Sequence, residues 1–319
     1  MLSLKSKISP SAIIGRAGIL GSPGKSLFPY MEHIAAQYHR QGRVRTSETY
    51  LATLSSFRKF RDNEDVLLKN IDSQLLETYE TYLRHRNLAP NTISFYMKHL
   101  RAVYNRAVDD GLIMDRHPFK RVNTSIEKTP KRAISLNTIR KIKSMDLEGS
   151  PSKLFARDMF LFSFYTRGMS FVDIAFLQKK NIKGNVLYYR RKKTNQQLAM
   201  HWEPCMQSML DKYHASPSSP YLFSIISGPS AHHRRQYLSA LSRVNRNLKI
   251  IGEELGLNYP LTMYCARHSW ASIAREEGIP LSVISEGMGH DSEKTTQIYL
   301  LSLKTEVIDN ANKKIIELL

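Results

Sequence analysis

Residues 119–133 separate two stretches of this sequence that are patterned differently. This segment has no apolar periodicity, is rich in Lys, Arg and Thr, and contains Pro130, which disfavours helix before it. Because 319 residues suffice for two domains with separate cores, we interpret the segment as a linker. The predicted organisation is a flexible basic tail over 1–26, a helical domain over 27–118, the linker over 119–133 and a second domain over 134–319.

The part before the linker is patterned for helices throughout. We predict helices over 28–41, 46–60, 73–86 and 91–109, joined by short polar connections. In the last helix, apolar residues recur at helical spacing and form one stripe: Ile93, Met97, Leu100, Val103, Tyr104 and Ala107. The opposite face is predicted to carry Asn91, Ser94, Lys98, Arg101 and Asn105. These side chains can contact phosphates and base edges if the helix lies in a DNA groove, or can simply form a solvated face.

The part after the linker is patterned for helices and one hairpin. We predict helices over 135–145 and 153–177, and two strands over 186–191 and 197–202 around Asn195-Gln196. The remainder to residue 319 is predicted to be helical. The expected fold class is therefore mainly α with a small β-sheet: a helical domain followed by an α+β domain.

The charge of the chain points to a polyanionic partner. The sequence has 47 Lys+Arg against 28 Asp+Glu, a net charge of +19, which favours binding to phosphate backbones. It contains no apolar run of 18 or more residues and no secretory signal pattern, so a membrane-spanning or secreted protein is disfavoured. Its two cysteines are typical of a reducing compartment. We expect a cytoplasmic or nucleoid-associated protein.

We predict no cofactor and no metal. Gly24-Lys25-Ser26 ends like a phosphate-binding loop, but the first position of that motif is Ile19 rather than Gly. Cys205 and Cys265 stand alone, and His232-His233 has no further Cys or His at ligand spacing.

Three elements near the C-terminus stand at close spacing: Arg267-His268-Ser269-Trp270, Gly289-His290 and Tyr299. Arg267 precedes His290 by 23 residues and His290 precedes Tyr299 by nine, so a helix, a turn and a second helix can bring the three side chains together. A planar guanidinium binds two phosphate oxygens at once, and a tyrosine can act as a covalent nucleophile. The constellation resembles the active-site signature of the tyrosine recombinases, also called phage-type integrases.

The resemblance implies an enzyme that breaks and rejoins double-stranded DNA without metal or nucleotide. Tyr299 is then the nucleophile that forms a 3′-phosphotyrosyl link, and Arg267 and His290 contact the phosphate. The four predicted helices of the first domain resemble the family's core-binding domain, which clamps one side of the duplex.

The predicted hairpin adds a further candidate. Lys193-Thr194 resembles the family's hairpin Lys-Thr, which implies that Lys193 protonates the leaving 5′ oxygen. Arg190, Arg191 and Lys192 stand beside it. The same run of cations can equally be a strand that binds the DNA backbone, so Arg190 and Arg191 are candidate DNA contacts.

The first arginine of the family's signature departs from the usual pattern. It usually stands three residues before an acidic residue, here Asp173, but that position is Ser170. Arg167 lies three residues earlier, and we assign it the first-arginine role. It can reach the phosphate from one turn away on the same helix, or because the segment 166–170 is not helical. The alternative is a structural salt bridge between Arg167 and Asp173.

The second departure is Tyr264, which stands where the family has a histidine, three residues before Arg267. A phenol can donate a hydrogen bond to a phosphate oxygen but is a poor base near neutral pH. We therefore expect Tyr264 to position the phosphate. His268 is expected to pack or cap rather than to replace the missing imidazole.

The end of the chain carries a short apolar stripe of Ile308, Ala311, Ile315 and Leu319. By resemblance, such a C-terminal helix docks on a neighbouring protomer in a homotetramer assembled on DNA; alternatively it folds back on its own core.

The sequence thus predicts a site-specific recombinase acting in integration, excision or inversion of a DNA element. Two alternatives are a catalytically weakened DNA-binding protein of the same fold and a type IB-like topoisomerase.

Overall fold

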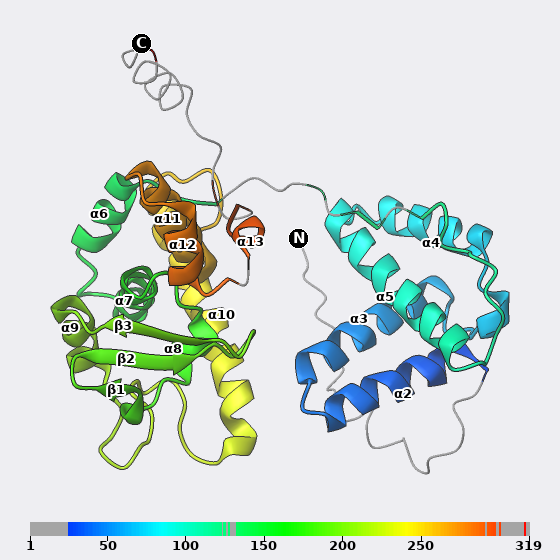
Figure 1. Ribbon diagram of the computed structural model, residues 1–319, viewed down its shortest axis with the longest axis horizontal. Helices are drawn as coiled ribbons and strands as arrows, with labels where there is room; N and C mark the ends of the chain where they lie inside the picture. The colour runs from blue at the N-terminus through cyan, green and yellow to red at the C-terminus, as the bar shows by residue number, and fades with distance from the viewer. Residues whose placement is uncertain are drawn as a thin grey trace. The chain divides into compact units, whose positions relative to one another are not determined.

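The structure is a computed structural model that describes residues 25–122, 124, 125, 127, 132–290, 292–297, 300 and 316. The chain forms two compact units, Met1–Thr129 and Pro130–Leu319 (Figure 1). The division falls inside the segment 119–133. No helix among the described residues combines the length and the apolar character that crossing a membrane requires.

The first unit is built from helices alone. They are α2 (Leu27–Arg40), α3 (Val44–Phe60), the 3-10 turn η1 (Leu68–Asn70), α4 (Ser73–His85) and α5 (Pro90–Asp109). The four predicted helices agree with α2, α3, α4 and α5 to within two residues at each end. Asp72 caps α4 by accepting a hydrogen bond from the backbone N–H of Leu75 at 2.8 Å.

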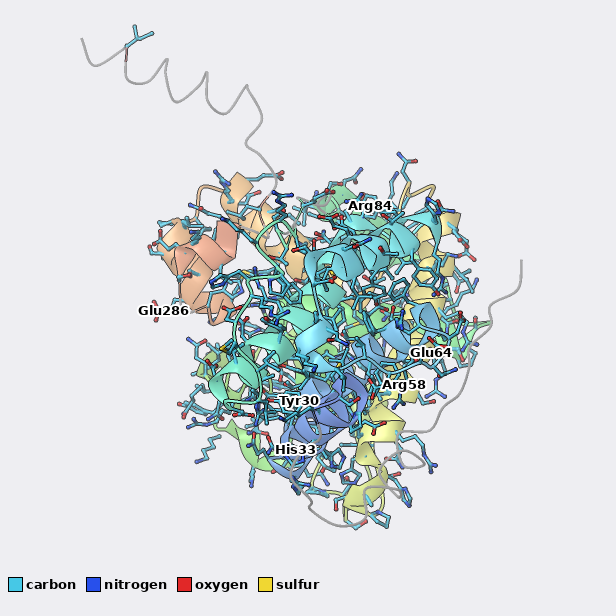
Figure 2. All side chains as sticks on the ribbon, turned by 90° about the vertical axis from the view of Figure 1, so that its right-hand side faces the viewer. Tyr30, His33, Arg58, Glu64, Arg84 and Glu286 are labelled. Atoms are coloured by element: carbon cyan, nitrogen blue, oxygen red, sulfur yellow. The ribbon has the colours of Figure 1, made fainter. Side chains whose placement is uncertain are left out.

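Aromatic and apolar side chains from all four helices form the core of this unit. Phe57 and Tyr79 pack edge to face with ring centroids 4.9 Å apart, and the buried Tyr79 hydroxyl donates to Ser56 Oγ at 2.7 Å. The buried Tyr30 donates from Oη to Asp110 at 2.6 Å, and Arg58 Nη2 donates to Glu32 at 2.8 Å; Tyr30 and Arg58 are labelled in Figure 2. These contacts tie α2 to α3 and to the end of α5.

Both predicted ends of the first domain need correction. Phe119 is 8% exposed and packs on Tyr104 in the core, so the linker begins later than residue 119. At the other end, Ser26 Oγ donates to Asp65 at 2.7 Å, so the last residues of the predicted tail belong to the unit. The rest of that tail, residues 1–24, lies outside the described residues.

The second unit combines helices with a small antiparallel sheet. Its strands are β1 (Ile182–Lys183), β2 (Val186–Arg190) and β3 (Gln197–His201), in the order β1-β2-β3, with Tyr188 opposite Ala199. The described helices of this unit are α6 (Leu136–Ser144), α7 (Pro151–Tyr165), α8 (Phe171–Ala175), the 3-10 turn η2 (Lys179–Asn181), α9 (Pro204–Tyr213), α10 (Ser230–Glu254), α11 (Met263–Glu276), α12 (Leu281–Met288) and α13 (Glu293–Gln297).

Helix α7 lies at the centre of the second unit, in contact with α6, α8, α9, α10 and α11 (Figure 1). It is apolar on most of its circumference because neighbours cover nearly every side. Phe160 and Phe162 are fully buried. The mainly α architecture with one small sheet confirms the predicted fold class.

Three predictions for this unit were wrong in detail. The helix predicted over 153–177 ends at Tyr165, and a short α8 follows. The segment 214–229 forms a loop with an isolated bridge between His214 and Phe223 instead of a helix, and β1 was not predicted. The helix ends because Arg167 (φ +59°) and Gly168 (φ +75°) adopt left-handed backbone conformations.

Candidate active site

Arg267 joins three parts of the second unit. It lies on α11, is 5% exposed, and donates from Nη1 to the Gly168 carbonyl at 3.0 Å. From Nη2 it donates to the Met288 carbonyl at 2.7 Å and contacts His290 Nε2 at 2.8 Å. The guanidinium is therefore held in one orientation by the turn after α7 and the end of α12.

Gly168 makes this arrangement possible. A Cβ at this position would lie 2.6 Å from Arg267 Cα, closer than any real Cβ contact, and its φ of +75° also favours glycine. The chain turns here because α11 passes directly against its backbone.

His290 follows the left-handed Gly289 that ends α12, where φ is +63°. A guanidinium can only donate, so the Nε2 atom facing Arg267 must be an acceptor. The proton is thus assigned to Nδ1, which lies 2.8 Å from Thr296 Oγ1. Burial and then the charges of Arg267, Arg191 and Lys193 lower the pKa of His290 to about 4. The imidazole is neutral at pH 7, in agreement with this tautomer.

Arg167 stands in the turn between α7 and α8 and is partly buried. Its Nη1 donates to the Ala199 carbonyl of β3 at 3.4 Å, and its Cδ would lie 3.6 Å from a Cβ placed on Gly287. Of the two predicted routes to the phosphate, the one along a continuous helix is wrong, and the segment 166–170 is indeed not helical. The carboxylate of Asp173 accepts from Ser170 Oγ at 2.6 Å and from the Lys192 backbone at 2.8 Å instead of from Arg167.

Three guanidinium groups lie near one buried phenol, that of Tyr189 on β2. Burial raises the pKa of Tyr189, and the charges of Arg267, Arg191 and Arg167 all act against that rise. Both predicted phosphate-binding arginines reach the end of α12: Arg267 Nη2 donates to the Met288 carbonyl at 2.7 Å, and Arg167 Cδ would lie 3.6 Å from a Cβ on the neighbouring Gly287.

Lys193 stands in the turn between β2 and β3 and is exposed. The turn is closed by Arg191 N donating to the Gln196 carbonyl at 2.9 Å and by Asn195 N donating to the Arg191 carbonyl at 2.8 Å. The charge of Lys193 is among the causes that lower the pKa of His290, after burial and the charges of Arg267 and Arg191.

Tyr264 is 53% exposed in the first turn of α11, one turn before Arg267. It contacts the buried His268 edge to face, with ring centroids 4.6 Å apart. The packing predicted for His268 is confirmed.

Tyr299 lies outside the described residues, as does the predicted docking stripe of the C-terminal helix. Two described residues stand on either side of Tyr299 in the sequence. Thr296 is fully buried against His290, and Leu300 is 4% exposed in an apolar cluster with Ala271, Ile284 and Met288.

The predicted DNA contacts on α5 divide into two groups. Lys98 and Arg101 are partly exposed, as a contact surface requires. Ser94 is 8% exposed, so its placement on the outer face was wrong: it directly follows Ile93 and lies at the edge of the apolar stripe. The side chain of Asn91 is hydrogen-bonded to the backbone of Glu127: it donates to the Glu127 carbonyl at 3.0 Å and accepts from the Glu127 N–H at 2.8 Å.

The two hairpin arginines also differ. Arg190 is exposed and donates from Nη1 to the Asn195 carbonyl at 3.1 Å. Arg191 is 8% exposed and its guanidinium donates to the carbonyls of Met288 and Gly289, so its assignment as a surface DNA contact was wrong. The alternation along β2, where Tyr189 is buried and Arg190 exposed, was the signal that residue 191 turns inward.

Sequence reasoning missed Gly168 and Thr296. In the part of the chain that the structure describes, no three His, Cys, Asp or Glu side chains gather closely enough to hold a metal ion.

Two family models match the chain. The model of the phage integrase family covers residues 134–306, and that of the phage integrase SAM-like domain covers residues 26–126. The chain belongs to the phage integrase family. It is a tyrosine-type site-specific DNA recombinase, an enzyme of DNA strand breakage and rejoining.

Individual relatives are distant but extend over most of the chain. The tyrosine recombinase XerC of Pediococcus pentosaceus is 24% identical over 294 residues, which cover 86% of this chain and 93% of that protein. The Tn1549 transposon integrase in complex with a circular intermediate DNA superimposes with a TM-score of 0.66 at 13% identity, covering 89% of this chain and 99% of that chain. The λ integrase tetramer bound to a Holliday junction gives 0.63 at 17% identity, covering 92% and 82%. These structural likenesses show the fold.

Proposed function

We propose that Tyr299 is the nucleophile of this recombinase. Its phenol loses its proton to solvent as the oxygen attacks a backbone phosphorus of double-stranded DNA, the P–O bond to the 5′ oxygen breaks, and a 3′-phosphotyrosyl link forms. A 5′ hydroxyl from a partner strand then attacks that link and releases the tyrosine. The observation that carries the proposal is the pair of the buried Arg267 and the partly buried His290, which holds a guanidinium and a neutral imidazole side by side.

We assign each of the remaining side chains a role in the reaction that suits its chemistry. Arg167 and Arg267 stabilise the charge that develops on the non-bridging oxygens. Tyr264 orients the phosphate through a hydrogen bond from its phenol, and His290, whose Nε2 accepts from Arg267, orients that guanidinium toward the phosphate. Lys193 transfers a proton from Nζ to the departing 5′ oxygen.

The position of Tyr299 in the sequence supports its role. It lies three residues after Thr296, which bonds to His290, and one before Leu300, which packs on Met288. The described residues on either side of Tyr299 therefore both contact residues at or just after the end of α12.

The DNA-binding mode follows from the two units and their charge. The first unit forms a clamp domain whose Lys98 and Arg101 contact phosphates on one side of the duplex. Residues 134–319 form the catalytic domain, where Arg190 adds a further contact. The λ integrase is known as a tetramer bound to a Holliday junction, which supports assembly of four protomers on DNA. We assign the contact between protomers to the C-terminal helix. Such an enzyme acts in the cytoplasm, at the nucleoid.

Capture of a covalent protein–DNA adduct tests the proposal. The substrate is a nicked duplex carrying an inverted repeat to be sought in the DNA that flanks the gene. Such a duplex loses the short cleaved end and traps the intermediate. The wild-type enzyme should form the adduct, and Tyr299→Phe should form none while binding the repeat with unchanged affinity. Tyr264→Phe is the matched control and should still form the adduct, because it removes a phenol of the same unit that is not the nucleophile.

Two results would contradict the proposal. Adduct formation by Tyr299→Phe would move the nucleophile to another residue. Relaxation of supercoiled plasmid that lacks the repeat would favour a type IB-like topoisomerase.

A further inference from the structure

The hairpin turn that carries Lys193 is attached to the turn that carries His290 through one buried side chain. Arg191 stands two residues before Lys193 and is 8% exposed. Its Nη1 donates to the Gly289 carbonyl and, at 3.3 Å, to the Met288 carbonyl. Gly289 immediately precedes His290 in the chain.

The Met288 carbonyl is shared between two arginines. It accepts from Arg267 Nη2 at 2.7 Å as well as from Arg191 Nη1. The end of α12 therefore fixes Arg267 on one side and Arg191, with the hairpin behind it, on the other.

The hairpin and the Gly289 backbone are also in direct contact. A Cβ on Gly289 would lie 2.9 Å from Gln196 Oε1, 3.0 Å from Leu198 Cδ1 and 3.1 Å from Arg191 Cδ. No side chain fits between the two segments, so a change in the position of one must be transmitted to the other.

The opposite side of the hairpin turn is held by Lys192. Its backbone N–H donates to the buried Asp173 at 2.8 Å, and its ammonium lies 4.2 Å above the Phe176 ring. Residues 191 and 192 are thus both anchored, whereas the next side chain, Lys193, is exposed.

We propose that Arg191 is a positioning residue for the reaction: its bonds to the Met288 and Gly289 carbonyls set the distance between Lys193 and His290, and so aim the Lys193 ammonium at the leaving 5′ oxygen. This inference rests on the proposed general-acid role of Lys193. Because Arg191 is 8% exposed and its guanidinium donates to these two carbonyls, we assign it a positioning role and not a contact with the phosphate.

Replacing Arg191 by methionine tests this role, because methionine keeps most of the length of the side chain but donates no hydrogen bond. Misplacing a catalytic group by about 1 Å can lower a rate by about 100-fold. We expect Arg191→Met to lower the rate of adduct formation by about 10- to 100-fold with site binding unchanged.

A second substrate distinguishes loss of proton transfer from general damage. In it, sulfur replaces the bridging 5′ oxygen at the cleaved position. An alkoxide must be protonated as the P–O bond breaks, whereas a thiol ionises near pH 8.5 and departs as the thiolate, with the electron pair of the P–S bond and no proton. If Arg191 acts through Lys193, Arg191→Met should be slow on the oxygen substrate and recover to within about threefold of wild type on the sulfur substrate.

Two companion variants separate the possible failures. The rate of adduct formation by Lys193→Ala should also return to near the wild-type rate on the sulfur substrate. If it does not, the proposed acid role of Lys193 is wrong, and the inference about Arg191, which rests on it, is wrong as well. If Lys193→Ala recovers and Arg191→Met does not, the acid role stands and the positioning role of Arg191 is overturned.

The matched control is Arg190→Met, which removes the same charge from the next position of the hairpin. The guanidinium of Arg190 bonds only within the hairpin in the described part of the chain, to Asn195 and Gln197. Its ratio of sulfur to oxygen rates should equal that of wild type. If the rate of Arg190→Met recovered on the sulfur substrate as much as that of Arg191→Met, the loss of positive charge, and not the loss of the bond to Gly289, would explain the defect.

Arg191→Lys covers the case in which the methionine variant does not fold. A lysine ammonium can still donate to one of the two carbonyls, so this variant should show a smaller defect on oxygen and the same recovery on sulfur. An equal defect on both substrates in a variant with wild-type thermal stability would overturn the inference.

Discussion

Substitution of Gly168 by alanine tests how closely α11 approaches the turn after α7. The new methyl group would lie 2.6 Å from Arg267 Cα and 2.7 Å from its Cγ. Ordinary van der Waals contact begins at 3.4 Å, so the backbone of α11 must withdraw by about 0.8 Å. Neither neighbour is the far end of a flexible side chain, so the substitution cannot be relieved by a rotamer change.

Two effects add in the free energy of unfolding. Placing a non-glycine residue at a φ of +75° costs about 1–2 kcal/mol. Overpacking against a helix backbone costs about 1–3 kcal/mol more. We expect Gly168→Ala to destabilise the second unit by about 2–5 kcal/mol in total.

Gly184→Ala is the matched control. Gly184, in the turn between β1 and β2, also has a positive φ of +58°, but a Cβ there would meet nothing within 4 Å. Gly184→Ala should lower the free energy of unfolding only through the unfavourable positive φ, by about 1–2 kcal/mol. The difference between the two variants therefore isolates the contact with Arg267.

Urea unfolding followed by tryptophan fluorescence is the suitable assay. Both tryptophans of the chain, Trp202 and Trp270, lie in the second unit, so the signal does not report on the first. Equal losses of stability in Gly168→Ala and Gly184→Ala would refute the close approach. At a urea concentration where Gly168→Ala remains folded, its adduct formation should still be slower than wild type, because the carbonyl that holds Arg267 has moved.

Three further predictions concern His290, its neighbour and the DNA contacts. Thr296→Val should destabilise the second unit by about 1–3 kcal/mol in urea unfolding, since it leaves His290 Nδ1 without its buried partner, whereas Thr296→Ser should retain most of the stability. Burial lowers the pKa of His290 from 6.5 to about 4, so the unfolded chain binds the proton first. Stability should then fall between pH 6.5 and 4, by about 1–2 kcal/mol after discounting for solvent screening, and this part of the pH dependence should vanish in His290→Gln; an unchanged slope would contradict it. Lys98→Ala should weaken binding to all DNA sequences equally and lower the slope of log affinity against log salt by about one, measured by fluorescence anisotropy; a sequence-dependent loss would mean a base contact instead.

The helices of the first unit could be predicted from the sequence because their apolar stripes are local patterns. Met97 and Leu100, for example, follow Ile93 at helical spacing and are all buried. Ser94 was misplaced because the width of a buried stripe depends on the neighbouring helices and not on the helix itself.

The break after α7 could not be predicted in the same way. Met169, Phe171 and Ile174 continue the apolar pattern beyond Tyr165, so periodicity alone favours one long helix. The chain turns because Gly168 must accommodate Arg267, a residue 99 positions later. Only tertiary structure determines that approach.

Among the active-site residues, the sequence order indicated Arg267 and His290, which the structure brings within 2.8 Å of each other. Thr296 and Arg191 could not be assigned as their supports, because those roles depend on where α13 and the hairpin turn lie. Arg191 was interpreted as a DNA contact because four successive cations can form a strand that binds the DNA backbone. Its burial follows from the alternation of β2 and from the carbonyls at the end of α12.

The central claim is that the phenol of Tyr299 forms the covalent bond to DNA at a phosphate held by Arg167 and Arg267. Trypsin digestion of the trapped adduct, followed by mass spectrometry of the peptide that retains a nucleotide, locates that bond directly. We expect the nucleotide on Tyr299. A nucleotide on Tyr264, Tyr189 or any other residue would contradict the assignment of the active site.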